Sequence, residues 1–224
     1  MLVLSFDTCF NKTYIVLRRD NEILANEVIS STDKEYHSVF LIPKIRDILQ
    51  SNNILIKDLD AISVNIGPGS FTGIRASITI ARVLCQQANI KLIGVPSLQI
   101  LSYLNESDRI TNVVLDARKN KVYFGKYQSG RILQEPKLVD LDEIQFEVEE
   151  DSFVVSDLKI FEILKEKQIE SVVYEKCDSD LGLYLSSISY DMLLNSNDDF
   201  NWAKVKPLYI QPPSITKPKE CKNV

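Results

Sequence analysis

The 224-residue chain has little histidine, few glycines and no long apolar run. Its single histidine, His37, excludes a metal site built on two histidines at helical spacing. The four cysteines, Cys9, Cys85, Cys177 and Cys221, form no C-x-x-C pair, so we expect reduced, packed thiols and no zinc or disulfide scaffold. No segment approaches the roughly 18 to 20 apolar residues that cross a bilayer, and the first residues lack the basic region of a signal peptide. We therefore expect a cytoplasmic protein without a membrane partner.

An excess of cations is also missing, because the net charge is −5 and the pI is about 5.1. A surface of this kind releases few phosphate counterions and argues against a free-standing nucleic-acid binder. RNA is expected as an indirect partner only.

Short apolar stretches bounded by turn residues predict a mixed α/β chain. In the first hundred residues the spacing predicts strands near 2–7, 13–19, 22–30, 60–67 and 91–95, and helices from about His37 to Gln50, over 71–88 and, as a short helix, from 97. Beyond them it predicts strands over 111–118, 121–128, 131–139, 153–157 and 171–175, and helices over 158–168 and 180–195. The first three strands form two hairpins, and strand, loop, helix, strand over 60–95 is a crossover that predicts parallel pairing. We expect an N-terminal lobe over 1–105, a smaller C-terminal α/β lobe over 106–210 and an extended tail over 211–224.

The predicted helix 71–88 carries two apolar stripes. The first stripe contains Phe71, Ile74, Ile78, Ala81, Cys85 and Ala88, and the second contains Ala76, Ile80, Val83 and Leu84. A helix that covers only its own sheet needs one stripe, so two stripes indicate burial on two sides. Either helix 37–50 of the same chain covers the second side, or the two helices together face a partner subunit. The candidate partner-facing residues are Leu41, Ile45, Phe71, Ile74, Arg75, Ile78 and Arg82.

The stretch "NIGPGSFTGIR" (65–75) places three of seven glycines directly before this helix. Glycine amides at a helix N-terminus can hold an anion, but the loop has no lysine, matches neither common phosphate motif and contains Pro68. Candidate anion or nucleotide contacts are Asp7, Thr8, Gly69, Ser70, Thr72, Gly73 and Asp116. The turns after Asp7 and Asp116 lack glycine, which argues that the chain is no competent nucleotidase by itself.

"GPGSFTGIR", together with "SFDTCF", "HSVFLIPKI", "GVPSL" and "LDARKNKVYFGKY", resembles the bacterial TsaB (YeaZ) family over about residues 1–130. The resemblance implies an actin-like ATPase (ASKHA) fold of two lobes with a mixed sheet, N-terminal β-hairpins and crossover helices. It also implies a non-catalytic subunit that supports threonylcarbamoyl transfer to adenosine 37 of tRNAs reading ANN codons. Its partners would be the catalytic actin-like subunit, joined through the two N-terminal helices, and a small P-loop ATPase. A homodimer through the same surface is the substitute when the partner is absent.

The resemblance implies no cofactor of the chain's own, although ATP or ADP and a divalent metal are expected in the complex. The chain departs from the family pattern at Ile66, Lys119, Asn120 and Gln211. The alternative reading is an enzyme, either an independent actin-like ATPase or a metallopeptidase-like protein.

Overall fold

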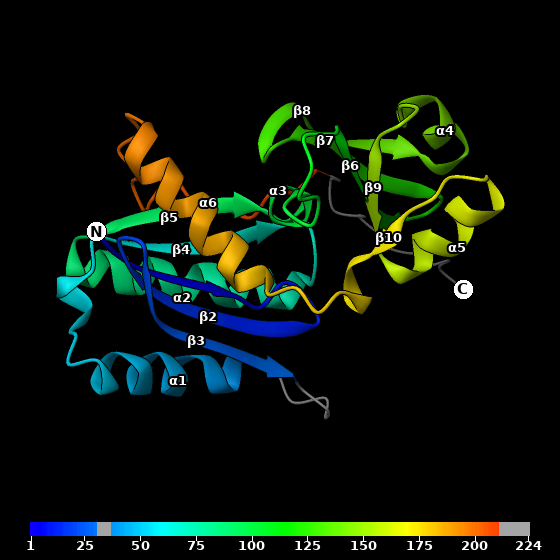
Figure 1. Ribbon diagram of the computed structural model, residues 1–224. Coiled ribbons are helices and arrows are strands. Elements are labelled where there is room, and N and C mark those ends of the chain that lie inside the picture. Colours follow the sequence, from blue (N-terminus) through cyan, green and yellow to red (C-terminus); the bar gives the residue numbers. More distant parts are fainter. Residues whose placement is uncertain (31–36, 211–224) are drawn as a thin grey trace, which may run out of the picture.

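The computed structural model describes residues 1–30 and 37–210, and at residues 37–39 it describes the backbone alone. The side chain of His37 and the expected tail over 211–224, with Gln211 and Cys221, lie outside the described residues. Within the described ranges, the strands form two five-stranded sheets (Figure 1).

The first sheet has the order β3-β2-β1-β4-β5. Its strands are Leu2–Asp7 (β1), Lys12–Arg19 (β2), Glu22–Ser30 (β3), Ala61–Gly67 (β4) and Lys91–Pro96 (β5). The strands β1, β2 and β3 pair antiparallel, while β1, β4 and β5 pair parallel. The two predicted hairpins and the predicted crossover are therefore confirmed. Parallel pairing explains why β1 and β4 are buried along almost their whole length.

The second sheet has the order β10-β9-β6-β7-β8. Its strands are Thr111–Arg118 (β6), Lys121–Gln128 (β7), Arg131–Asp140 (β8), Phe153–Ser156 (β9) and Val172–Val173 (β10). The predicted strand over 171–175 is wrong in its second half, because residues Tyr174–Lys176 form a 3-10 turn. The β6–β7 hairpin turns through Lys119 and Asn120 with positive φ angles of 53° and 57°, the conformation that a two-residue turn between twisted strands requires.

Helices cover both sheets. They are His37–Ser51 (α1), Phe71–Ala88 (α2), Ser97–Ser102 (α3), Ile144–Glu147 (α4), Leu158–Glu166 (α5) and Leu181–Asn195 (α6), with 3-10 turns at Ile56–Asp58 (η1) and Leu141–Glu143 (η2). The helix α2 begins where the Ser70 hydroxyl accepts a hydrogen bond from the Gly73 amide, and it ends at Asn89, whose φ is 52°. None of the helices in residues 1–30 and 37–210 combines the length and apolar character of a membrane crossing.

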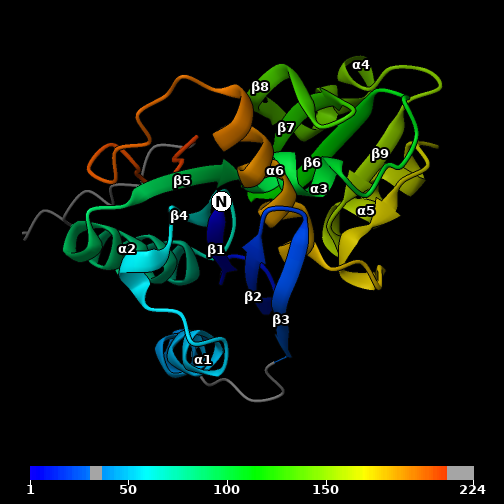
Figure 2. The same ribbon diagram turned by 60° about the vertical axis from the view of Figure 1, so that its left-hand side comes forward.

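Three apolar cores hold these layers together. The first lies between the first sheet and the helices α1 and α2, and the third lies between the second sheet and the helices α4 and α5. The second core joins the two lobes, because it takes side chains from both sheets and from α3 and α6. Figure 2 shows α3 and α6 between the sheets, with α6 on the face of the first sheet opposite α2.

From α6 onward, the chain returns to the first lobe. The helix α6 packs on β1 and β2, the Leu92 amide donates to the carbonyl of Phe200, and the Leu208 amide donates to the carbonyl of Ile66. The sequence-based division placed residues 106–210 in a lobe of their own. In the structure, the part of that range up to β10 builds the second sheet. The later helix α6 instead covers the face of the first sheet that α1 and α2 leave open.

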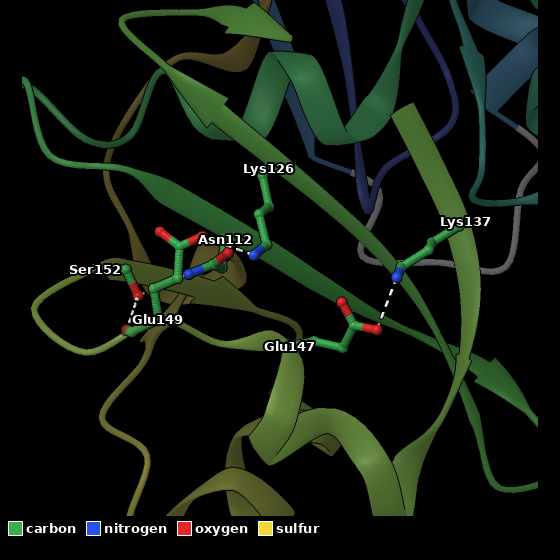
Figure 3. A network of polar contacts seen from close by, with 6 residues as sticks. All are labelled: Asn112, Lys126, Lys137, Glu147, Glu149 and Ser152. Atoms are coloured by element: carbon green, nitrogen blue, oxygen red, sulfur yellow. Dashed lines mark hydrogen bonds and ion pairs between the residues drawn. The ribbon is translucent and has the colours of Figure 1, made fainter. Parts of the chain in front are cut away.

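The acidic end of α4 and the segment that follows it are held against the second sheet by two lysines (Figure 3). Lys126 contacts Glu149 and Lys137 contacts Glu147, each with 2.7 Å between nitrogen and oxygen. Asn112 donates to the Ser152 hydroxyl at 2.6 Å, and this hydroxyl donates to the Glu149 carbonyl. The segment, which shows no clear periodicity in the sequence, is thus placed by side chains from β6, β7 and β8.

Candidate functional site

Asp7 ends β1 and is buried, with 1% of its surface exposed. One carboxylate oxygen accepts a hydrogen bond from the Cys9 amide at 2.5 Å, and the other accepts one from the side-chain amide of Asn65 at 2.9 Å. Burial raises the pKa of Asp7 from 3.8 to about 6, against the lowering effect of these hydrogen bonds. Burial and the nearby carboxylate of Asp7 also raise the pKa of the Cys9 thiol. Asp7 therefore presents no oxygen to a metal or a nucleotide.

Asn65 connects Asp7 to the glycine loop, and the sequence reasoning missed it. Its side-chain oxygen accepts hydrogen bonds from the Gly67 amide at 2.8 Å and from the Ser97 hydroxyl at 2.7 Å. These two donors fix the orientation of the Asn65 amide, so that its nitrogen faces Asp7. The available signal was a lone amide residue inside the apolar strand "AISVNIG".

The glycines of the loop make room for the neighbouring turn between β1 and β2. A Cβ atom added at Gly73 would lie 1.8 Å from the carbonyl oxygen of Thr8, and one added at Gly69 would lie 3.0 Å from that of Cys9. The Thr8 hydroxyl donates to the Gly73 carbonyl at 2.8 Å, and the Ser70 amide donates to the Cys9 carbonyl at 3.0 Å. Beside Gly73, the space that a phosphate would need is filled by this chain's own backbone.

Phe10 closes the same turn. It is 6% exposed, and its ring centroid lies 5.4 Å from that of Tyr174 in the second lobe. Asp7, Thr8 and Gly73, expected as anion contacts, thus serve packing in this structure. The nucleotide and metal that an actin-like fold implies do not fit at this turn, because Asp7 is buried and hydrogen-bonded within the chain and the backbone of the turn packs against Gly69 and Gly73.

The other expected anion contacts line an open cleft between the lobes, whose volume is about 1360 Å³. Gly69, Ser70 and Thr72 lie on one wall, and Asp116 lies on the opposite wall. Asp116 contacts the Lys159 ammonium at 2.6 Å and accepts from the Arg118 amide at 2.9 Å. No group of three or more side chains suited to a metal occurs in the part of the chain that the structure describes.

The expected partner-facing residues fall into two groups. Four of them are core residues of this chain and not surface residues, namely Leu41, Ile45, Ile74 and Ile78, which are at most 5% exposed. Their stripe packs α1 and α2 onto the first sheet. Their assignment to a partner surface needs correction, because a helical stripe reveals burial but not the neighbour that buries it.

Phe71, Arg75 and Arg82 remain accessible in whole or in part. Phe71 and Arg75 lie at the mouth of the interlobe cleft, where Arg75 donates to the Tyr209 hydroxyl at 3.0 Å and its guanidinium lies 3.8 Å from the centre of the Phe71 ring. Arg82 is half-buried farther along α2.

An apolar groove of about 570 Å³ runs between α1, η1 and α2. Its lining residues are Ile42, Ile45, Arg46, Leu49, Gln50, Ile54, Leu55, Ile56, Lys57, Thr79, Ile80, Val83 and Leu84. Ile42 and Leu55 are each 58% exposed, and Val83 is 52% exposed. The second stripe of α2 therefore meets α1 on one side and borders open apolar surface on the other, and a partner subunit on that open side stays a prediction.

Comparison with known proteins shows which family the chain is similar to. Residues 22–145, more than half of the chain, match the family model described as TsaD, tRNA N6-adenosine threonylcarbamoyltransferase. A Bacillus subtilis relative named tRNA threonylcarbamoyladenosine biosynthesis protein TsaB is 32% identical over 141 residues, covering 62% of this chain and 61% of the relative. The Escherichia coli protein of the same name is 30% identical over 132 residues, covering 57% of this chain and 55% of the relative. The matched region thus spans less than two thirds of these relatives.

YeaZ from Pseudomonas aeruginosa has a similar structure, with a TM-score of 0.76 over 93% of this chain and 99% of that chain. At 19% identity this likeness concerns the fold alone. Together with the family model it confirms the expected actin-like fold with mixed sheets. The chain therefore belongs to the family described by the TsaD model, and among the proteins compared it is similar to those named TsaB.

Proposed function

We propose that the chain is a non-catalytic subunit in tRNA threonylcarbamoyladenosine synthesis and that it docks the catalytic actin-like threonylcarbamoyltransferase subunit through the α1–α2 groove. The transfer it supports is to adenosine 37 of tRNAs reading ANN codons, with a small P-loop ATPase as third partner. A second copy of the chain would occupy the groove when the catalytic subunit is absent. The names of the relatives support the pathway, and the groove supports the docking.

The single observation that carries this proposal is the exposed apolar surface of the groove. Ile42, Leu55 and Val83 each leave more than half of their surface in water, although large apolar side chains usually bury theirs. Apolar patches of this kind, bordered here by Arg46 and Lys57, mark interaction surfaces in soluble proteins. Two helices that offer a common apolar face suit a helix-bundle interface with a partner.

The closed turn at Asp7 argues against an independent ATPase. An actin-like ATPase needs an acid and backbone amides that reach the phosphates and their metal, whereas Asp7 and the amides of Gly67 and Gly73 here bond to this chain. Any ATP, ADP or divalent metal in the complex would accordingly be held largely by the other subunits.

Co-expression with the catalytic subunit tests the proposal, and Val83→Asp is its sharpest variant. A carboxylate in the groove would be desolvated on docking, so we expect co-purification to fall at least about tenfold. Leu133→Asp on β8 is the matched control, because Leu133 has the same 52% exposure and lies outside the groove. Both variants should melt within a few degrees of the parent.

Co-purification of Val83→Asp at the parent level would remove the groove from the interface. Modification of tRNA by the catalytic subunit without this chain would refute the function itself. Ile78→Asp is unsuitable as a probe, because Ile78 is 3% exposed and a carboxylate there would unfold the monomer.

A further inference from the structure

An aromatic cluster at the cleft mouth, formed by Phe71, Arg75 and Tyr209, is separate from the α1–α2 groove. The two ring centroids are 6.1 Å apart and their planes are inclined by 36°. Arg75 is fixed between them by its hydrogen bond to Tyr209 and its contact with Phe71. Phe71 is 56% exposed and Tyr209 is 51% exposed, so much of both rings remains in water although both lie against the guanidinium.

The cleft behind this cluster carries positive charge on an acidic protein. Its lining contains the cations Arg75, Arg118, Lys119 and Lys159 and the acids Asp116, Asp157 and Glu175, which sum to +1, whereas the rest of the chain sums to −6.

The acids of the cleft are largely committed to this chain. Both oxygens of Asp157 accept backbone hydrogen bonds, from Ile160 at 2.8 Å and from Asp116 at 2.5 Å. One oxygen of Glu175 accepts from the Leu158 amide at 3.3 Å. Asp157 and Glu175 therefore bond to the cleft's own backbone, and Asp116 pairs with Lys159 within the same lining.

We propose that the Phe71–Arg75–Tyr209 cluster and the cations of the cleft bind a short segment of single-stranded RNA, with unpaired bases stacked on the exposed rings. Aromatic platforms beside cations are the recurrent device for binding single strands, and they accept any base because every base has a flat face. The chain as a whole is acidic, with a net charge of −5, so we expect phosphates to approach at the cleft, where the charges of the lining sum to +1. The inference rests on the proposed function only in taking tRNA as the RNA that the complex meets.

The test is a fluorescence-anisotropy titration of the full chain with a labelled oligoadenylate of about 12 nucleotides, which suits a small single-strand site. We expect binding at low salt with a Kd on the order of 10⁻⁵ to 10⁻⁴ M. Phe71→Ala and Tyr209→Ala should each weaken it by roughly 5- to 100-fold, the range measured for loss of one base stack. Tyr209→Phe keeps the ring and should stay within about threefold of the parent.

Phe146→Ala on α4 is the matched control, because Phe146 is 81% exposed and lies outside the cleft. The proposal is supported if Val83→Asp abolishes co-purification with the catalytic subunit but retains RNA binding. Phe71→Ala should retain co-purification but lose RNA binding. It is overturned if the parent does not bind the oligonucleotide, if Phe71→Ala and Tyr209→Ala bind as the parent does, or if an RNA duplex of equal length binds as tightly. Loss of co-purification in Phe71→Ala with RNA binding unchanged would instead make the cluster a protein-docking surface. If the parent chain did not co-purify with the catalytic subunit, this would count against the proposed function. The titration would still decide whether the cluster binds RNA.

Discussion

Asp7→Asn gives a quantitative prediction about the buried turn. The pKa of Asp7 rises from 3.8 to about 6 in the folded chain. At about 1.4 kcal/mol per pKa unit, ionising this carboxylate in the folded state costs about 3 kcal/mol at neutral pH. Because the folded pKa is the higher one, the stability contributed by the protonated acid is complete below pH 3.8 and is lost as the pH rises through about 6.

The substitution removes this cost but also one hydrogen bond. The side-chain oxygen of Asn65 accepts from Gly67 and Ser97, so its side-chain nitrogen stays directed at residue 7. The amide nitrogen of an asparagine at position 7 would then face another hydrogen-bond donor. A lost hydrogen bond costs about 1 kcal/mol. We therefore expect Asp7→Asn to be about 2 kcal/mol more stable than the parent at about pH 7.5, and only about 0.5 kcal/mol more stable at about pH 5.

Urea unfolding of both proteins at the two pH values measures this difference directly. The gap should shrink by about 1.5 kcal/mol between about pH 7.5 and pH 5, and at the higher pH it corresponds to roughly 4 to 8 °C in Tm for a chain of this size. Other titrating groups are common to both proteins and cancel in the comparison. A gap that is the same at both pH values, or a parent that is the more stable protein at pH 7.5, would refute the reasoning.

Two further predictions concern packing and capping. Gly73→Ala would place a Cβ atom 1.8 Å from the Thr8 carbonyl oxygen, so we expect urea unfolding to show a loss of about 3 kcal/mol or more in the free energy of unfolding. Gly69→Ala would place its Cβ atom 3.0 Å from the Cys9 carbonyl oxygen and should cost clearly less. Equal costs for the two variants would contradict the close-approach argument. Asp157→Ala removes the acceptor of the Ile160 and Asp116 amides, and it should lower the free energy of unfolding by about 1 to 2 kcal/mol. Asp157→Asn should restore part of this loss. If Asp157→Ala left the stability unchanged, the cap would not stabilise α5.

Local patterns in the sequence predict most elements of this fold. The spacing of apolar residues predicts α2 at its observed bounds, and the turn residues predict the two hairpins of the first sheet. The return of α6 was not predictable, because its sequence "LGLYLSSISYDMLLN" shows that the helix is buried but names no partner sheet. The same limit applies to Ile74 and Ile78, whose stripe fits a sheet and a partner subunit equally well.

The site could be predicted only in part. The glycine loop was found, but its role depends on the carbonyls of Thr8 and Cys9, which are about 60 residues away in sequence. The cleft-mouth cluster joins Phe71 to Tyr209, and no local pattern links positions so far apart. Contacts of this kind follow from topology rather than from spacing.

The position of α6 has a consequence for synthesis of the chain. The first sheet is complete once β5 has emerged, yet the helix that covers its second face follows only at Leu181–Asn195. At about 5 to 20 residues per second, the ribosome needs roughly 5 to 20 s to add the intervening segment. During that interval the growing chain exposes apolar side chains of β2, β4 and β5, among them Tyr14, Ile93 and Val95, which α3 and α6 cover in the finished protein. We therefore expect the nascent first lobe to present an aggregation-prone apolar face until almost the whole chain has been made.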